Sequence, residues 1–280
     1  MEYRAKNKAA WEEAFDKRFP NWGDENHIRL KSEKLAFFDS DLKAELEQMS
    51  FEDKHVAQFC CNNGRELLSL VDFGAKSGVG FDFAENILEQ AKDTAKRAGI
   101  TNCSFVLTDI LEIPESYHDQ FDFILMTVGV IPWFADLASL FKKAADCLKS
   151  GGLLLINEAH PLCFMLPFAG EDCFDENNLD RLTYSYFRKE PWIETDGMEY
   201  LAGTYPSKPF TSYTHTMGSI FNALYAQGLK VIKLNEYDYD IGMGDAYDNR
   251  GYPLSYILIA EKEGGQGTVP CPPIAEKGKQ

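Results

Sequence analysis

A strand, a turn, a helix and a second strand ending in an acid follow one another over residues 55–82. The apolar run His55–Phe59 is too short for a helix and predicts a buried strand. A polar turn leads into a helical pattern over Arg65–Phe73, and the second apolar run ends on Asp82. Units of this kind are typical of nucleotide-binding folds, in which the turn presents backbone N–H groups and the acid accepts hydrogen bonds from a ribose. The succession therefore predicts an α/β sheet with a nucleotide-type cofactor at one edge.

The turn reads Cys-Cys-Asn-Asn-Gly and keeps one glycine, Gly64. Asn62 is a plausible substitute for a second glycine, because asparagine tolerates a left-handed backbone better than most residues. No Gly-x-Gly-x-x-Gly is present to let a pyrophosphate approach the backbone. A nicotinamide-dependent oxidoreductase is therefore disfavoured, whereas a cofactor without phosphate can dispense with that approach.

Strand and helix patterns keep alternating after Asp82. Helices are predicted over 85–98, 133–148 and 219–227, and strands over 103–107, 121–126, 153–157, 229–234 and 253–260. Strands separated by helices at this spacing are joined by crossovers and run parallel. The predicted fold class is a doubly wound, seven-stranded, mostly parallel sheet.

Residues 54–160 resemble the class I S-adenosylmethionine-dependent methyltransferases. The resemblance rests on the unit ending in Asp82, on Phe-Asp-Phe-Ile-Leu-Met at 121–126, and on Leu-Lys-Ser-Gly-Gly-Leu-Leu-Leu-Ile-Asn-Glu at 148–158. The family's acidic-x-Gly-x-Gly-x-Gly pattern is altered here, since Gln58 replaces the acid and Cys60 and Asn62 replace two glycines. The resemblance implies a Rossmann-like fold whose last two strands are antiparallel at the edge, with S-adenosyl-L-methionine as the cofactor.

The family motifs imply a set of cofactor contacts. Asp82 would hold the ribose, Asp109 the adenine amino group, and Thr127 would approach the methyl donor. The full predicted set is Gln58, Cys60, Asn62, Gly64, Asp82, Phe83, Asp109, Ile110 and Thr127.

The acceptor is predicted to lie between the fifth strand and an aromatic-rich insertion at 161–214, because loops at strand carboxyl ends carry function. Part of this insertion resembles that of a bacterial subgroup acting on small molecules. His160 is the candidate catalytic residue, as a general base for a hydroxyl or amine; a structural histidine bonded to the insertion is the alternative. Predicted acceptor contacts are Trp133, His160, Tyr186, Trp192 and His215.

The chain divides into a helical segment at 1–50, a methyltransferase domain at 51–262 and a flexible tail at 263–280. The helical segment either caps the cofactor and acceptor or packs on the sheet, and the two readings are compatible. The expected function is methyl transfer to a small molecule; a non-catalytic S-adenosylmethionine-binding protein is the alternative.

Composition limits the partners. The net charge of −16 disfavours a nucleic acid, whose binding depends on Lys and Arg. No apolar run suits a membrane span, and the seven cysteines lack the spacing of a disulfide framework or a metal site. We therefore expect a cytoplasmic monomer or homodimer that uses no metal.

Overall fold

The computed structural model describes residues 2–242 and 244–264. Apart from its first two residues, the predicted tail at 263–280 lies outside this part of the chain. None of the described helices is long and apolar enough to cross a membrane.

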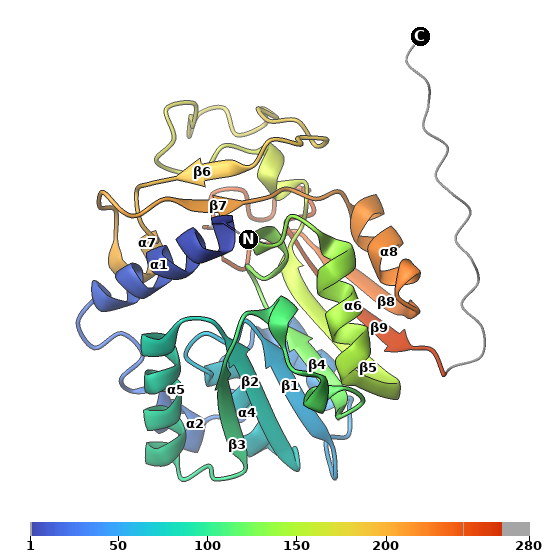
Figure 1. Ribbon diagram of the computed structural model, residues 1–280. Coiled ribbons are helices and arrows are strands. Elements are labelled where there is room, and N and C mark those ends of the chain that lie inside the picture. Colours follow the sequence, from blue (N-terminus) through green and yellow to red (C-terminus); the bar gives the residue numbers. More distant parts are fainter. Residues whose placement is uncertain (1, 243, 265–280) are drawn as a thin grey trace.

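A central seven-stranded sheet has the order β3-β2-β1-β4-β5-β9-β8 (Figure 1). The strands are β1 (His55–Phe59), β2 (Ser77–Asp82), β3 (Cys103–Leu107), β4 (Phe121–Met126), β5 (Leu148–Ala159), β8 (Leu229–Tyr237) and β9 (Ser255–Lys262). Within this sheet only β9 runs antiparallel to its neighbours, β5 and β8. The predicted mostly parallel, doubly wound sheet is confirmed, and of the last two strands β9 is the reversed one.

Helices cover both faces of the sheet. They are α1 (Glu2–Asp16), α2 (Asn26–Ser32), α3 (Ser40–Glu47), α4 (Arg65–Phe73), α5 (Glu85–Ala98), α6 (Leu137–Cys147), α7 (Glu199–Ala202) and α8 (Met217–Ala226). The apolar sides of α6 and α8 pack on one face, and those of α3 and α4 on the other. Helix α5 follows its predicted pattern, burying Ile87, Leu88, Ala91 and Ala95 and ending at Gly99, which has a φ of 81°.

Two boundaries differ from the prediction for local reasons. Helix α6 begins at Leu137 instead of Trp133, because Asp136 caps it by accepting hydrogen bonds from the N–H groups of Ala138 and Ser139. Trp133 lies in a separate 3-10 turn, Ile131–Trp133. Strand β5 begins at Leu148, and the predicted turn at 150–152 is an irregularity in its pairing with β4.

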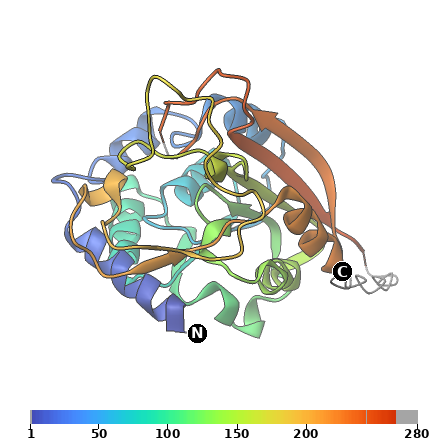
Figure 2. The same cartoon turned by 90° about the horizontal axis from the view of Figure 1, so that it is seen from above.

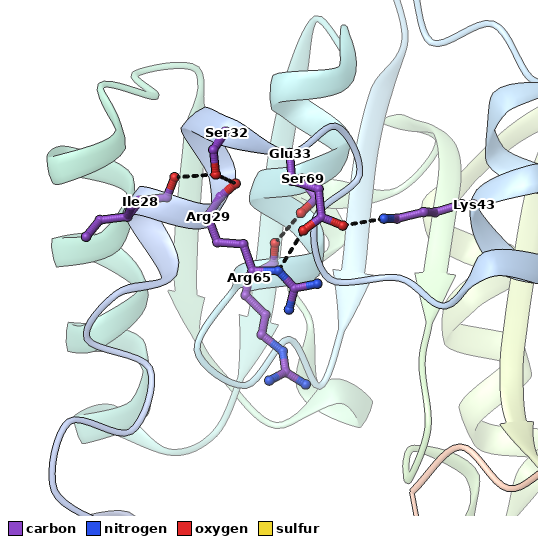
Figure 3. A network of polar contacts seen from close by, with 7 residues as sticks. All are labelled: Ile28, Arg29, Ser32, Glu33, Lys43, Arg65 and Ser69. Atoms are coloured by element: carbon purple, nitrogen blue, oxygen red, sulfur yellow. Dashed lines mark hydrogen bonds and ion pairs between the residues drawn. The ribbon is translucent and has the colours of Figure 1, made fainter.

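The segment before β1 serves two purposes. Helices α2 and α3 pack on the domain, with Leu30 of α2 against α4 and α5 and with Leu42 and Leu46 of α3 on the sheet. The Glu33 carboxylate joins the two helices, accepting from Arg29 at 2.8 Å and from Lys43 at 2.5 Å (Figure 3). Helix α1 instead reaches the carboxyl ends of the strands. The expected packing on the sheet is therefore made by α2 and α3, whereas the cap over cofactor and acceptor stays a prediction for α1.

Asp39 ties the start of α3 to the sheet. One carboxylate oxygen accepts from the N–H groups of Asp41 and Leu42 at 3.0 and 2.8 Å, and the other accepts from Asn157 of β5 at 3.2 Å. We expect Asp39→Ala to lower the free energy of unfolding by about 1–2 kcal/mol, measured by urea denaturation. Glu47→Ala, at the exposed end of the same helix, should change it by less than about 0.5 kcal/mol. Equal losses in the two variants would refute a capping role for Asp39.

The 161–214 segment forms a roof over the sheet edge (Figures 1 and 2). It contains α7 and a two-stranded antiparallel sheet of β6 (Trp192–Glu194) and β7 (Phe210–Ser212). Asn7 of α1 clamps this roof from the side: its amide donates to the Thr211 carbonyl and its oxygen accepts from the Thr211 N–H, each at 2.8 Å. Helix α1 and the 161–214 segment thus cover the sheet edge together.

Candidate functional site

A cavity of about 410 Å³ lies at the carboxyl ends of β1, β2, β4 and β5. The strand order reverses between β1 and β4, which is where open α/β sheets bind ligands. Its lining from the sheet side includes Gln58, Cys60, Asn62, Asp82, Phe83, Thr127, Val128, Gly129, Val130, Pro132, Trp133, Glu158 and Ala159. Six of the nine predicted cofactor residues are in that group.

The loop after β1 takes the left-handed backbone that its sequence suggested. Asn62 has a φ of 50° and Gly64 a φ of 71°; Cys60 also has a φ of 50°, which was not predicted. Burial raises the pKa of the Cys60 thiol well above its usual value, so the thiol is protonated. Gly64 lies beneath the loop, where an added Cβ would stand 2.4 Å from the Phe105 ring.

Asp82 ends β2 at the cavity wall and is 9% exposed. One carboxylate oxygen accepts from the Asn62 N–H at 2.9 Å and the other from the Ala84 N–H at 3.0 Å. Burial raises the pKa of this carboxyl, while the backbone donors act in the opposite direction. Each oxygen keeps a lone pair for a further donor, as a pair of ribose hydroxyls requires.

Gln58 of β1 links helix α4 to the residue that follows β4. Its carbonyl oxygen accepts from the Leu67 N–H at 3.1 Å, and its amide donates to the Thr127 hydroxyl at 3.2 Å. The acid that is usual in the family would carry a charge at this position. The neutral Gln58 amide instead forms a hydrogen-bonded bridge between β1 and the end of β4.

Asp109 and Ile110 do not line the cavity. Asp109 accepts from Arg4 of α1 at 2.6 Å and from the Leu111 N–H at 2.9 Å, and Ile110 is buried in the core. The carboxylate of Asp109 thus holds Arg4 of α1 outside the cavity lining, and its contact with an adenine amino group stays a prediction.

Glu158 is the last residue of the 148–158 motif, and it was not among the predicted site residues. It is 2% exposed and lines the cavity. Its two oxygens accept from the N–H groups of Gly129, Ile131 and Ala159 at 2.9–3.1 Å. Glu158 therefore fixes the loop after β4 from within the cavity wall. Burial raises its pKa to about 7, against the effect of these donors.

The raised pKa predicts a stability change with pH. Because the folded protein holds this proton more tightly than the unfolded chain, the stabilisation is full below about pH 4.5 and is lost as pH rises through about 7. Asp82 and Glu194 also have raised pKa values, so the comparison must isolate Glu158. The unfolding free energy of the wild type minus that of Glu158→Gln should fall by about 2 kcal/mol between roughly pH 5.5 and 8. A difference that stays constant across this range would contradict the raised pKa.

His160 lies outside the cavity lining and is 6% exposed. Its Nδ1 accepts from the Leu162 N–H at 3.1 Å, and its Nε2 lies 3.0 Å from a Glu236 carboxylate oxygen. The ring thus points toward β8 and β9, where it meets Tyr256 edge-on. The predicted general base does not fit this placement, and the structural alternative does.

Of the other predicted acceptor residues, one lines the cavity and three do not. Trp133 lines the cavity. The Tyr186 hydroxyl accepts from the Met217 N–H at 3.0 Å, and the Trp192 ring packs against Tyr184 and Arg188, so neither reaches the cavity. His215 donates from Nε2 to the Phe134 carbonyl at 2.9 Å and borders a separate space of about 10 Å³ behind Glu158.

Most residues on the outer side of the cavity were not among the predicted site residues. The additional lining residues are Trp11, Trp22, Arg65, Glu66, Ile87, Phe164, Glu194, Tyr200, Ser212, Ile241 and Gly242. Trp11 and Trp22 come from the helical segment at 1–50, and Tyr200 comes from the aromatic-rich insertion at 161–214. Their placement against the cavity depends on contacts between distant segments, which leave no local signal.

The residues present fit an adenosyl cofactor. Asp82 offers two acceptor oxygens at the end of β2, Phe83 follows it as an apolar wall, and the left-handed loop brings backbone close to the same space. The described residues include no group of three or more His, Cys, Asp or Glu side chains that could hold a metal ion.

The family model for a methyltransferase domain matches residues 50–187. That range holds β1 to β5, the 60–64 loop and Asp82. The match identifies residues 50–187 as a methyltransferase domain. The fold is that of the class I S-adenosylmethionine-dependent methyltransferases, in agreement with the predicted enzyme class and cofactor.

Individual relatives are distant. A putative S-adenosylmethionine-dependent methyltransferase from Listeria monocytogenes superposes with a TM-score of 0.62 at 18% identity, covering 79% of this chain and 97% of that one. An uncharacterized protein of Haemophilus influenzae is 22% identical over 67% of this chain and 71% of its own length. A tRNA U34 carboxymethyltransferase of Aliarcobacter butzleri is 29% identical over 54% of this chain, which spans 49% of that protein. These likenesses leave the methyl acceptor open.

Proposed function

We propose that the protein transfers a methyl group from S-adenosylmethionine to a small molecule held in the roofed cavity. The observation that carries this proposal is the roof itself. Helix α1, β6, α7 and β7 cover the carboxyl ends of the strands and contribute Trp11, Glu194, Tyr200 and Ser212 to the lining. A roofed space of about 410 Å³ suits a cofactor with a small partner.

Each part of the wall has a task in this proposal. The cofactor supplies an electrophilic methyl group. Asp82 accepts from the ribose hydroxyls, and the Gln58–Thr127 bridge holds the end of β4 beside the acceptor. Glu158 keeps the following loop rigid. Orientation and exclusion of water can supply most of the rate in such a site.

A tRNA acceptor is the second candidate, because one curated relative is a tRNA U34 carboxymethyltransferase. Two features oppose it. The chain carries a net charge of −16, and Arg65 is the single cation among the described residues that line the cavity. Phosphate backbones are bound by clusters of Lys and Arg.

The acceptor class can be tested with methyl-labelled S-adenosylmethionine. The protein is incubated with the dialysable fraction of a bacterial extract or with total tRNA from the same extract, and the label is counted after separation by size. We expect label in dialysable products and none above background in tRNA. Label in tRNA would overturn the proposed small-molecule acceptor.

A further inference from the structure

Acidic side chains outnumber basic ones in the cavity wall. Glu66, Asp82, Glu158 and Glu194 line it, whereas Arg65 is the only cation among its described lining residues. Arg65 Nε lies 2.8 Å from a Glu66 carboxylate oxygen, so these two charges neutralise each other. Three carboxyl groups remain without a matching cation.

These three carboxyl groups differ in the hydrogen bonds that they already accept from the protein. Asp82 and Glu158 accept backbone N–H groups, as described above. The carboxylate of Glu194, on strand β6 of the roof, makes no hydrogen bond or ion pair among residues 2–242 and 244–264, and the residue is partly open to solvent. Burial raises the pKa of the Glu194 carboxyl to about 7, and the nearby Asp196 and Glu171 carboxylates raise it further. The roof therefore brings to the cavity an acid whose carboxylate has no protein partner among the described residues.

Aromatic rings make up much of the remaining wall. They are Trp11, Trp22, Phe83, Trp133, Phe164 and Tyr200. Several of them touch: the Trp11 ring lies 5.7 Å from Trp133 and 6.4 Å from Tyr200, and the Trp22 ring lies 6.4 Å from Tyr200. Aromatic faces attract cations through the ring quadrupole, most strongly in desolvated sites. This wall and the acids favour the same sign of ligand charge.

We propose that the methyl acceptor is a small organic amine that binds as its ammonium ion between Glu194, Glu158 and the aromatic wall. The ammonium gives one proton to the Glu194 carboxylate, and the lone pair of the neutral amine then attacks the sulfonium methyl, whose bond to sulfur breaks to leave the neutral thioether S-adenosylhomocysteine. The inference rests on the proposed function and adds the chemical class of the substrate. The sulfonium of the cofactor supplies one positive charge, which still leaves the lining net negative. An acceptor carrying phosphate or carboxylate would meet acids with no unpaired cation to bind it, at a cost in desolvation.

The test uses matched probes of opposite charge on the protein saturated with S-adenosylhomocysteine. Tryptamine is compared with indole-3-propionate, and phenethylamine with 3-phenylpropionate, by isothermal calorimetry. We expect each amine to bind at least about tenfold more tightly than its acid. Equal or tighter binding of the acids, or no binding of either amine, would overturn the inference.

Two variants locate the effect. Glu194→Gln should reduce the amine preference by about tenfold, because it removes the unpartnered roof charge. Glu199→Gln, an exposed acid on α7 that does not line the cavity, should keep the preference. An unchanged preference in Glu194→Gln would also refute the assignment. Failure of S-adenosylhomocysteine to bind would instead refute the proposed function, so the two failures are distinguishable.

Discussion

Gly64→Ala is expected to destabilise the protein by about 2–5 kcal/mol. The Cβ would stand 2.4 Å from Cε1 and 2.7 Å from Cζ of Phe105, and 3.1 Å from the Ala91 Cβ. The φ of 71° adds the strain that any L-residue has in the left-handed region. Gly64 is the last residue of the 60–64 loop and directly precedes α4. Because a shift at Gly64 would also move this loop, binding of S-adenosylhomocysteine should fall as well. Urea denaturation and calorimetry measure the two effects.

Gly99→Ala is the matched control for this prediction. Gly99 also has a left-handed φ, of 81°, but nothing lies within 4 Å of its Cβ position. It should therefore lose only the strain contribution, about 1–2 kcal/mol, and keep its cofactor affinity. If the two variants lose the same stability, the contact with Phe105 has no energetic importance.

Asp82→Ala is expected to weaken binding of S-adenosylhomocysteine by about 1–3 kcal/mol, or roughly 5- to 150-fold. The carboxylate is the acceptor for the ribose hydroxyls and also fixes the 60–64 loop through the Asn62 N–H. Both effects act in the same direction, and calorimetry on the folded variant measures their sum. Asp72→Ala, an exposed acid on α4 away from the cavity, should bind like the wild type. Wild-type affinity in Asp82→Ala would remove Asp82 from the site.

Local sequence patterns were sufficient to predict the sheet and the cavity residues that lie at the ends of its strands. Gly74 and Gly99 ended α4 and α5 where predicted, because a left-handed or otherwise positive φ closes each helix. Once parallel strands were recognised, the residues after β1, β2 and β4 had to meet at one edge. Asp82 could therefore be placed at this edge from sequence spacing, and Thr127 from the family resemblance.

The insertion was expected beside the acceptor, but its contacts with α1 could not be predicted because distant segments make them. Asn7 and Thr211 hold α1 against β7 across 204 positions of sequence, and nothing local marks the pair. His160 lies outside the cavity lining for a related reason. A side chain beyond the end of a strand is not restricted to alternate faces, and this one turns toward Glu236 of β8. The sequence indicated that Glu158 lies at the end of a strand, but it did not indicate that its carboxylate fixes the loop after β4.

Hydrogen exchange with and without S-adenosylhomocysteine tests most directly whether the cavity at the sheet edge is the cofactor site. The account predicts saturable one-to-one binding, with slower exchange concentrated at residues 60–64, 82–84 and 127–131. The edge strand β8 serves as the internal control, since it is remote from that space and should exchange at the same rate in both states. Absence of binding, or protection that spares all three segments, would contradict the assignment.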